Sequence, residues 1–252
     1  MERAVNVVFI TTDDPLYLPG FFDRVLSGRP ETTAVLVAPP LYGDQTTIGA
    51  AWRYLRTFGI RATVALAKRS LHAKLARRSV ADTCARRGVR CVHVNDVNSP
   101  SVLHRLEEWS TDVVVSVSCP QIFRRPLIDL PRRGCLNLHG AILPHYRGVL
   151  PSFWMLANGE QRAGVSLFFM NEDIDGGDLC GQRMFEIRDT DTLDSLIRRS
   201  KAVAAELVLD ALDGIESDTV VREPLDLAAG SYYSWPDQAA VRRFRTSGRR
   251  LW

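Results

Sequence analysis

Short apolar runs, each followed by a helical pattern, recur along the first half of this chain. Residues 5–10, 33–38 and 112–117 are almost wholly apolar and rich in valine, and residues 90–94 form a shorter run. Apolar residues on both faces are typical of strands in a parallel sheet that helices cover on both sides. Residues 101–109 carry apolar side chains at helical spacing between two of these runs. The alternation predicts an α/β fold with a mostly parallel central sheet.

The second half of the chain has a different pattern. Residues 165–170 predict a strand, and residues 184–187 predict a weaker one. A long helix should follow, because apolar residues then recur every three or four positions. Asp191 or Thr192 is expected to cap its N-terminus, and Gly214 is expected to end it.

The charge of the chain is small but unevenly placed. A net charge of +3 over 252 residues does not by itself indicate a nucleic-acid or membrane partner. Residues 63–90 are nevertheless strongly basic and carry a single acid. Leu66, Leu71, Leu75 and Val80 suggest one helical apolar face in this stretch, whose basic side chains would face solvent or contact an anionic substrate.

Cysteine usage and hydropathy indicate a cytoplasmic protein. The five cysteines are scattered without a CxxC pair, which predicts free thiols in a reducing compartment. The first ten residues lack the apolar core of a signal peptide. No apolar run approaches the ~20 residues that a membrane span needs, so we expect no membrane association.

The segment after the first predicted strand argues against two common cofactor classes. Residues 11–20 read TTDDPLYLPG, with one glycine and two prolines. A dinucleotide-binding fold would place GxGxxG there, and a P-loop would read GxxxxGK[ST]. We therefore expect neither NAD nor FAD, and no P-loop nucleotide site.

Residues 136–181 contain the densest group of polar side chains that could take part in catalysis. Asn137 and His139 are two positions apart at the end of a predicted strand, so both should point to the same face. Asp175 lies in a glycine-containing turn after the strand at residues 165–170. The sequence thus predicts an amide, an imidazole and a carboxylate around one pocket.

These three groups suit acyl transfer. The amide N–H and a protonated imidazole can stabilise an oxyanion that develops on a carbonyl under attack. The carboxylate can orient the imidazole and move a proton away from the attacking group. No protein nucleophile is evident, which favours direct transfer to an amine. A metal site of His139 and His145 with Asp175 or Asp178 is the rival interpretation, but the spacing does not support it and we expect no metal.

The same residues resemble a known family. Asn137-x-His139, the motif LPxYRG at residues 143–148, and the Asp-x-Gly that begins at Asp175 are similar to the formyltransferases that use N10-formyltetrahydrofolate. That family includes methionyl-tRNA formyltransferase, glycinamide ribonucleotide formyltransferase and the sugar N-formyltransferases. The resemblance is strongest over residues 112–182.

The resemblance implies a fold and a set of catalytic roles. The fold would be Rossmann-like, with a catalytic domain of residues 1–215 and a short C-terminal extension of residues 216–252. Asn137 and His139 would hold the oxyanion that forms when an amine attacks the formyl carbon. Asp175 would assist proton removal and keep His139 charged.

The resemblance also implies where the two substrates bind. The co-substrate N10-formyltetrahydrofolate would contact Ser118, Cys119, Pro120, Gln121, Ile122, Phe123, Met170, Glu172, Asp173 and Ile174. The acceptor amine would approach Thr11, Thr12, Asp13, Tyr146 and Arg147.

The leading hypothesis is an N-formyltransferase that acts on a primary amine of a small molecule, either an amino sugar nucleotide or a natural-product intermediate. Methionyl-tRNA formyltransferases carry a larger C-terminal domain than residues 216–252 could form, so nucleic acid is not the expected partner. The alternatives are a 10-formyltetrahydrofolate hydrolase, a methionyl-tRNA formyltransferase without the large C-terminal domain, and a non-catalytic binding module. The sequence leaves the choice between a monomer and a homodimer open.

Overall fold

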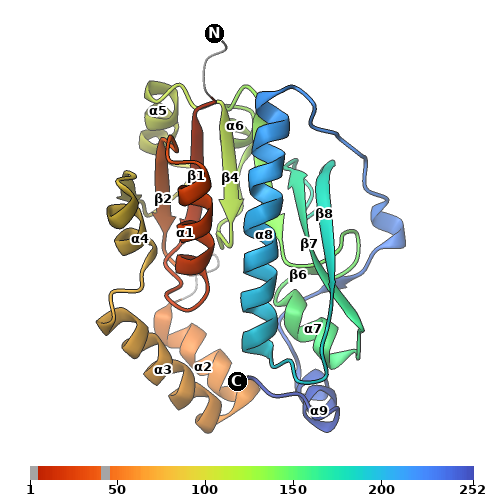
Figure 1. Cartoon of the computed structure of the whole chain (residues 1–252). Helices are drawn as coiled ribbons and strands as arrows, with labels where there is room; N and C mark the ends of the chain where they lie inside the picture. Colours follow the sequence, from red (N-terminus) through yellow and green to blue (C-terminus); the bar gives the residue numbers. More distant parts are fainter. Residues whose placement is uncertain (1–4, 41–45) are drawn as a thin grey trace.

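A central sheet runs through the molecule (Figure 1). The computed structural model describes residues 5–40 and 46–252. In spatial order, the strands found there are β3 (Cys91–His93), β2 (Ala34–Ala38), β1 (Val7–Thr12), β4 (Val113–Val117), β5 (Gly134–His139), β7 (Arg162–Phe169) and β8 (Leu179–Glu186). The strands from β3 to β5 pair in parallel, whereas β7 and β8 are antiparallel at one edge. The predicted α/β fold with a mostly parallel sheet is confirmed.

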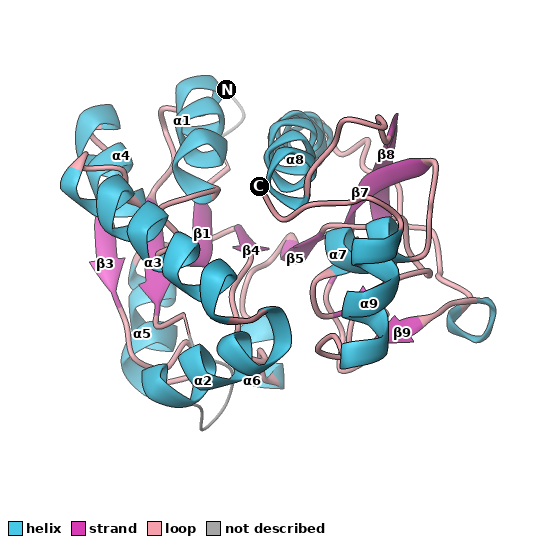
Figure 2. Cartoon of the chain, turned by 90° about the horizontal axis from the view of Figure 1, so that it is seen from below, coloured by secondary structure: helices cyan, strands magenta, loops and turns pink. Residues whose placement is uncertain are grey.

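Helices cover both faces of this sheet, as Figure 2 shows. One layer contains α1 (Leu18–Gly28), α4 (Val80–Arg87) and α8 (Leu193–Glu216), and the other contains α5 (Pro100–Glu108) and α6 (Arg125–Ile128). The side chains of β1 divide between the two layers: Phe9 packs in the first, and Val8 and Ile10 pack in the second. Both faces of the central strands are therefore dry, which explains their unbroken apolar sequence.

A third apolar cluster lies near the carboxyl ends of the parallel strands. It is built from α2 (Thr47–Phe58), α3 (Ile60–Leu75), α7 (Pro151–Ala157) and α9 (Gln238–Thr246). The ring of Phe153 contacts three others at centroid distances of 5.0 to 5.7 Å, those of Phe58, Trp154 and Phe244.

The C-terminal segment packs into this third cluster. A short 3-10 helix (Leu227–Ala229) leads to β9 (Tyr232–Tyr233), which pairs in parallel with β6 (Arg147–Gly148). The indole N–H of Trp235 donates a hydrogen bond to Thr57 at 2.9 Å. Residues 216–252 thus brace the loop in which the predicted LPxYRG motif lies.

The order of the strands creates a switch point between β1 and β4. From β1 the chain moves outward to β2 and β3, and it then returns to β4 on the other side of β1. Crevices at the carboxyl ends of strands on either side of such a reversal are the usual ligand sites of open α/β sheets. Ser116 of β4 lies opposite Asn137 of β5 in the register, which places the predicted amide beside this switch.

Two sequence expectations about helices are wrong. The long helix does not end at Gly214 but continues to Glu216, and Asp218 (φ 54°) takes the left-handed conformation expected of a terminal glycine. Leu71 and Leu75 do not share a buried face with Val80, because α3 ends at Leu75 and α4 begins at Val80. Both leucines are exposed, and Val80 is buried.

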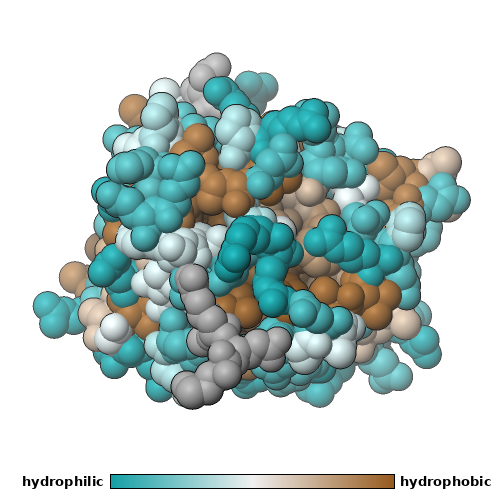
Figure 3. All heavy atoms as spheres, turned by 90° about the horizontal axis from the view of Figure 1, so that it is seen from above, coloured by the Kyte–Doolittle hydropathy of each residue, from teal (hydrophilic) through white to brown (hydrophobic). Residues whose placement is uncertain are grey.

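The end of the molecule at which the parallel strands begin has a mixed surface. Figure 3 shows hydrophilic side chains spread over this end, with smaller hydrophobic areas between them. Among the helices of the described residues, none combines the length and the apolar character needed to cross a bilayer.

Candidate active site

A cavity of about 560 Å³ opens at the carboxyl ends of β1, β4 and β5. The segments that follow these strands form part of its wall, and the loop after β7 and the first half of α8 form much of the remainder. This volume is typical of a small-molecule site. The cavity also lies at the switch point between β1 and β4, where the topology favours ligand binding.

The structure brings the predicted amide, imidazole and carboxylate together in this cavity. Asn137 and His139 reach it from the end of β5, and Asp175 reaches it from the loop after β7. His139 Nδ1 lies 3.6 Å from Asp175 Oδ2. His139 Nε2 lies 2.7 Å from the carbonyl oxygen of Tyr146. A carbonyl only accepts hydrogen bonds, so Nε2 carries a proton and Nδ1 is the ring atom that faces the carboxylate.

Two glycines, one in the LPxYRG motif and one in the Asp-x-Gly motif, fix the position of Asp175. The backbone N–H of Gly148 donates a hydrogen bond to Asp175 Oδ2 at 2.9 Å. Gly177 lies so close to the carbonyl group of Phe169 that a Cβ atom there would overlap its oxygen. Asp175 itself has a left-handed backbone (φ 50°), which is uncommon outside glycine and concentrates at functional sites. The Asp-x-Gly spacing therefore reflects a tightly constrained turn.

All ten residues expected to contact the folate lie on the cavity wall. They form two facing segments, residues 118–123 after β4 and residues 170–174 after β7. Ile122 and Ile174 are 73% and 55% exposed. Large aliphatic side chains at the rim of a cavity favour a partly apolar ligand, because its binding would remove them from water.

Among the described residues, one thiol lines the cavity, and it is poorly suited to nucleophilic attack. Cys119 lies on the wall, and burial raises its pKa to about 11. The thiolate is the reactive form of cysteine, so this side chain is almost entirely neutral near pH 7.

Only one of the five residues expected near the acceptor lies on the cavity wall. Thr12 is there, but Thr11 is fully buried, and its hydroxyl donates a hydrogen bond to the carbonyl oxygen of Val117 at 2.7 Å. Asp13 accepts a hydrogen bond from the backbone N–H of Val80 at 3.2 Å, at the start of α4. Both side chains serve the packing around β1.

Tyr146 and Arg147 lie behind the wall. The ring of Tyr146 stacks on Tyr233 at 5.1 Å, and its hydroxyl hydrogen-bonds to Glu160. Tyr146 contributes to the site through its carbonyl group, which holds His139. Arg147 pairs through its backbone with Tyr232, and its buried Nε has no hydrogen-bond partner within the described residues.

Several residues of the cavity wall were not singled out in the sequence. They are Asp14 and Tyr17 from the segment after β1, and Ile197, Ser200 and Lys201 from α8. A signal for Lys201 exists, because it interrupts the apolar stripe of a predicted helix at a position in register with Ile197. No signal marks Asp14 or Tyr17, whose role depends on how α8 packs across the sheet.

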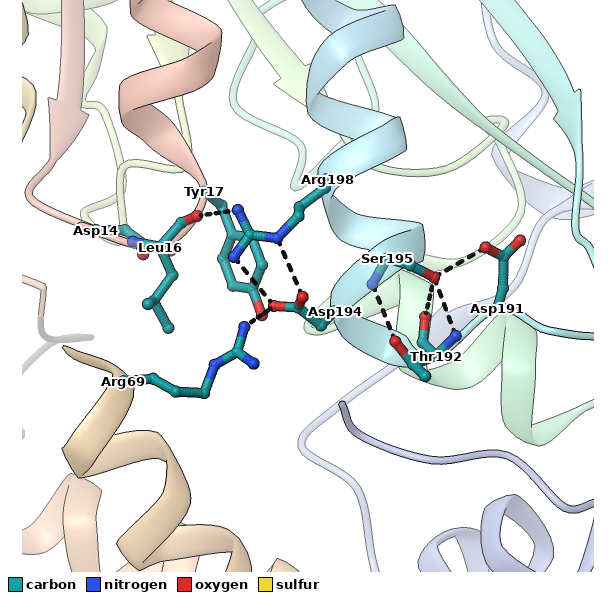
Figure 4. A network of polar contacts seen from close by, with 9 residues as sticks. All are labelled: Asp14, Leu16, Tyr17, Arg69, Asp191, Thr192, Asp194, Ser195 and Arg198. Atoms are coloured by element: carbon teal, nitrogen blue, oxygen red, sulfur yellow. Dashed lines mark hydrogen bonds and ion pairs between the residues drawn. The ribbon is translucent and has the colours of Figure 1, made fainter. Parts of the chain in front are cut away.

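A polar network ties this part of the wall together, as Figure 4 shows. The carboxylate of Asp194 accepts hydrogen bonds from the hydroxyl of Tyr17 and from the guanidinium groups of Arg69 and Arg198. Arg198 also lies over the ring of Tyr17 and donates to the carbonyl oxygen of Leu16. Elements far apart in sequence, α3, α8 and the segment after β1, are thereby fixed beside the cavity.

Burial and charge shift the pKa values of two groups on this wall, Asp14 and Lys201. Burial raises the pKa of Asp14, although the backbone N–H of Leu16 and the charge of Lys201 act in the opposite direction. Burial also lowers the pKa of Lys201 to about 8, against the attraction of Asp14. Lys201 is still mostly protonated near pH 7.

Comparison with known proteins shows which family the chain resembles. Residues 49–212 match the sequence profile described as formyl transferase. Methionyl-tRNA formyltransferase from Ruminiclostridium cellulolyticum is 30% identical over 159 residues, which are 63% of this chain and 51% of that protein. The chain spans about half the length of the curated relatives it matches.

Solved structures share the fold at lower identity. A sugar N-formyltransferase from a Shewanella species superimposes with a TM-score of 0.59 at 20% identity, over 92% of this chain and 77% of that one. The N-formyltransferase from Helicobacter canadensis, solved with folinic acid and dTDP-3-aminofucose, gives a TM-score of 0.59 at 16% identity, over 91% and 71%. The structural likeness shows a shared fold, and because the sequence profile covers more than half of the chain, this chain belongs to the formyl transferase family.

Proposed function

We propose that this protein is an N-formyltransferase that moves the formyl group of N10-formyltetrahydrofolate to a primary amine of a small molecule. The observation that carries the proposal is the meeting of Asn137, His139 and Asp175 in one cavity, beside two segments with apolar side chains at its rim. Membership of the formyl transferase family supports it.

Each of the three side chains has a role that its position allows. The amide N–H of Asn137 and a proton on His139 Nδ1 would donate to the oxygen of the carbonyl under attack, as oxyanion donors do. Asp175 lies beside Nδ1 and would receive the proton that the amine loses, directly or through water. The carbonyl group of Tyr146 keeps the imidazole in its orientation.

The residues present fit a folate donor. The donor supplies the activated formyl group, and the protein needs a slot for a flat ring with polar edges. Ile122 and Ile174 stand at the rim, while Asn171, Glu172 and Asp173 add polar groups to the same wall. Gln121 is held by hydrogen bonds to the backbone of Val97 and Asn95, so the segment after β4 is anchored before any ligand binds.

A small amine is the acceptor that the proposal favours. Two structural neighbours are named as N-formyltransferases, one of them for sugars and one solved with an amino sugar nucleotide. We therefore assign the acceptor to amino sugar nucleotides or amine intermediates of natural products. Methionyl-tRNA is the second candidate, because the curated relatives with about 30% identity are methionyl-tRNA formyltransferases.

The test is a transfer assay with mass detection. Purified protein is incubated with N10-formyltetrahydrofolate and, separately, with dTDP- and UDP-linked amino sugars, other small amines and methionyl-tRNA. We expect one small amine to gain roughly 28 mass units, the mass of CO, and the His139→Asn variant to lose the reaction. Formate release without any amine would favour the hydrolase, and a gain on methionyl-tRNA alone would favour the second candidate.

A further inference from the structure

Lys201 is out of place on the stripe of α8 that faces the cavity. Leu193, Ile197 and Ala204 recur with it at helical spacing, and all four line the cavity. A lysine costs free energy in such surroundings because its ammonium loses water, so charged groups there are normally paired. The ammonium of Lys201 therefore needs a polar or anionic partner.

The ammonium of Lys201 is only partly satisfied by the protein. Nζ donates a hydrogen bond to the Ser118 hydroxyl at 2.7 Å. Within the described residues, no carboxylate lies within ion-pairing distance of Nζ, although Asp14 is near enough to attract it. An ammonium has three N–H donors, and so two of them remain for a ligand.

The Ser118 contact places Lys201 beside the reacting groups. Ser118 follows β4 directly, and β4 pairs with the strand that carries Asn137 and His139. Ser118 also belongs to the segment expected to contact the folate. A group bound to Lys201 would therefore lie close to the formyl carbon, on the wall formed by α8 rather than on the wall formed by residues 170–174.

Among the described residues that line the cavity, Lys201 is the only lysine or arginine. Arg69 and Arg198 belong to the neighbouring network, and both are paired with Asp194. The acidic residues of the lining are Asp14, Glu172, Asp173 and Asp175, of which Asp14 attracts the Lys201 ammonium. Lys201 is therefore the group on the α8 wall that can pair with an anion of a ligand.

We propose that Lys201 binds an anionic group of the acceptor, a carboxylate or a phosphate, and so selects amines that carry such a group near the nitrogen. The inference rests on the proposed function and narrows its substrate class. Lys201 would act on recognition of the acceptor and would leave the chemistry to Asn137, His139 and Asp175.

Matched acceptor pairs test this inference. One pair is an amino acid and its amide, and the other is an amino sugar nucleotide and the methyl glycoside of the same amino sugar. Formyl transfer from N10-formyltetrahydrofolate gives kcat and KM for each. In one pair, we expect the anionic member to have a KM at least tenfold lower than that of its neutral partner. The pair that shows this preference identifies the anion as a carboxylate or a phosphate.

Variants of Lys201 complete the test. Lys201→Met should raise KM for the anionic acceptor about tenfold or more and leave the neutral one unchanged, whereas Lys201→Arg should restore part of the preference. Lys74→Met is the matched control, since Lys74 is exposed on α3 and lies outside the cavity. Titration with folinic acid establishes that each variant still binds the donor.

Three outcomes would overturn the inference. The wild-type protein could show no preference within either pair, Lys201→Met could impair both members equally, or the variant could lose folinic acid as well, which would assign Lys201 to the folate segment. If the wild-type protein binds folinic acid but formylates no amine of either pair, the proposed function fails, and this inference fails with it.

Discussion

The imidazole of His139 is held by a hydrogen bond at one ring nitrogen and faces a carboxylate with the other. Nε2 is 2.7 Å from the Tyr146 carbonyl oxygen, and Nδ1 faces Asp175 at 3.6 Å. Asp175 is itself fixed by the N–H of Gly148. The orientation of the ring therefore depends on backbone groups of the LPxYRG loop as well as on the carboxylate. Such preorganisation lets hydrogen-bond donors act on a developing oxyanion without reorganising.

The first prediction concerns these side chains. His139→Asn and Asp175→Asn should each lower kcat by about 10²–10⁴, because each removes an oxyanion donor or the proton acceptor. Affinity for folinic acid should change little, since neither change fills the folate slot. Rapid-mixing assays and calorimetric titration measure the two quantities. Near-normal turnover in either variant would contradict the assigned roles.

For single residues, the sequence could predict the direction of those side chains that strand geometry fixes. Asn137 and His139 had to share a face because they are two positions apart on a strand. Thr11 and Asp13 do not line the cavity, and the sequence does not show which side chains near β1 pack inward. Lys201 and Tyr17 enter the wall only through the packing of α8, which is a long-range property.

Among the elements, α8 has a strongly specified beginning. Thr192 and Ser195 exchange side-chain to backbone hydrogen bonds in a capping box. Asp191, which is buried, accepts hydrogen bonds from the backbone of Arg188, the hydroxyl of Ser195 and the guanidinium of Arg199. Burial alone would raise the pKa of Asp191, but these donors outweigh it and hold the pKa below its usual 3.8.

The second prediction follows from that pKa. The carboxylate of Asp191 stabilises the fold above the unfolded pKa of about 3.9, and this contribution is lost as the pH falls through the lower folded value. Asp191→Asn should lower the free energy of unfolding by about 2 kcal/mol at pH 7. Urea unfolding at a series of pH values should show this difference shrinking below pH 4. A difference that is the same at pH 3 and pH 7 would contradict the argument.

The third prediction tests the turn that carries Asp175. In Gly177→Ala, the new Cβ must push away the backbone of Phe169, so the loop has to move. We expect kcat to fall about tenfold or more, because small displacements of catalytic groups are costly. Gly20→Ala in α1 is the matched control, since a Cβ there meets nothing within 4 Å. Equal activity of the two variants would show that the turn tolerates movement.

Strands were easier to predict than helix boundaries. The valine-rich runs could only be strands buried on both faces, and each of them lies in the sheet. The stretch from α3 to α4 was misjudged because its leucines and Val80 fit one helical period, although the leucines belong to α3 and Val80 begins α4. Arg77, with φ 52°, lies in the turn that separates these helices, and the sequence gives no glycine or proline there.

In the whole molecule, the site is assembled from two layers. The sheet brings the ends of β1, β4 and β5 together, and α8 closes the cavity across the switch point. The C-terminal segment supports the loop beside the site through the pairing of β9 with β6. Its contribution was not foreseen, because short segments without strong periodicity reveal little about where they pack.

The fourth prediction concerns this support. Phe244 of α9 is buried and stacks on Phe153 at 5.0 Å. Phe244→Ala should lower the free energy of unfolding by about 3–5 kcal/mol, as large-to-small changes in a core do. Arg242→Ala, at an exposed position of the same helix, should stay within about 0.5 kcal/mol of the parent. Thermal and urea unfolding would measure both, and equal effects would show that α9 is not packed as described.

The most direct measurement is a crystal structure of the protein bound to folinic acid. We predict that the ring system lies between residues 118–123 and residues 170–174, with Asn137, His139 and Asp175 around the end that bears the formyl-carrying nitrogen. A folate bound elsewhere, or one whose formyl end points away from these three side chains, would contradict the central claim.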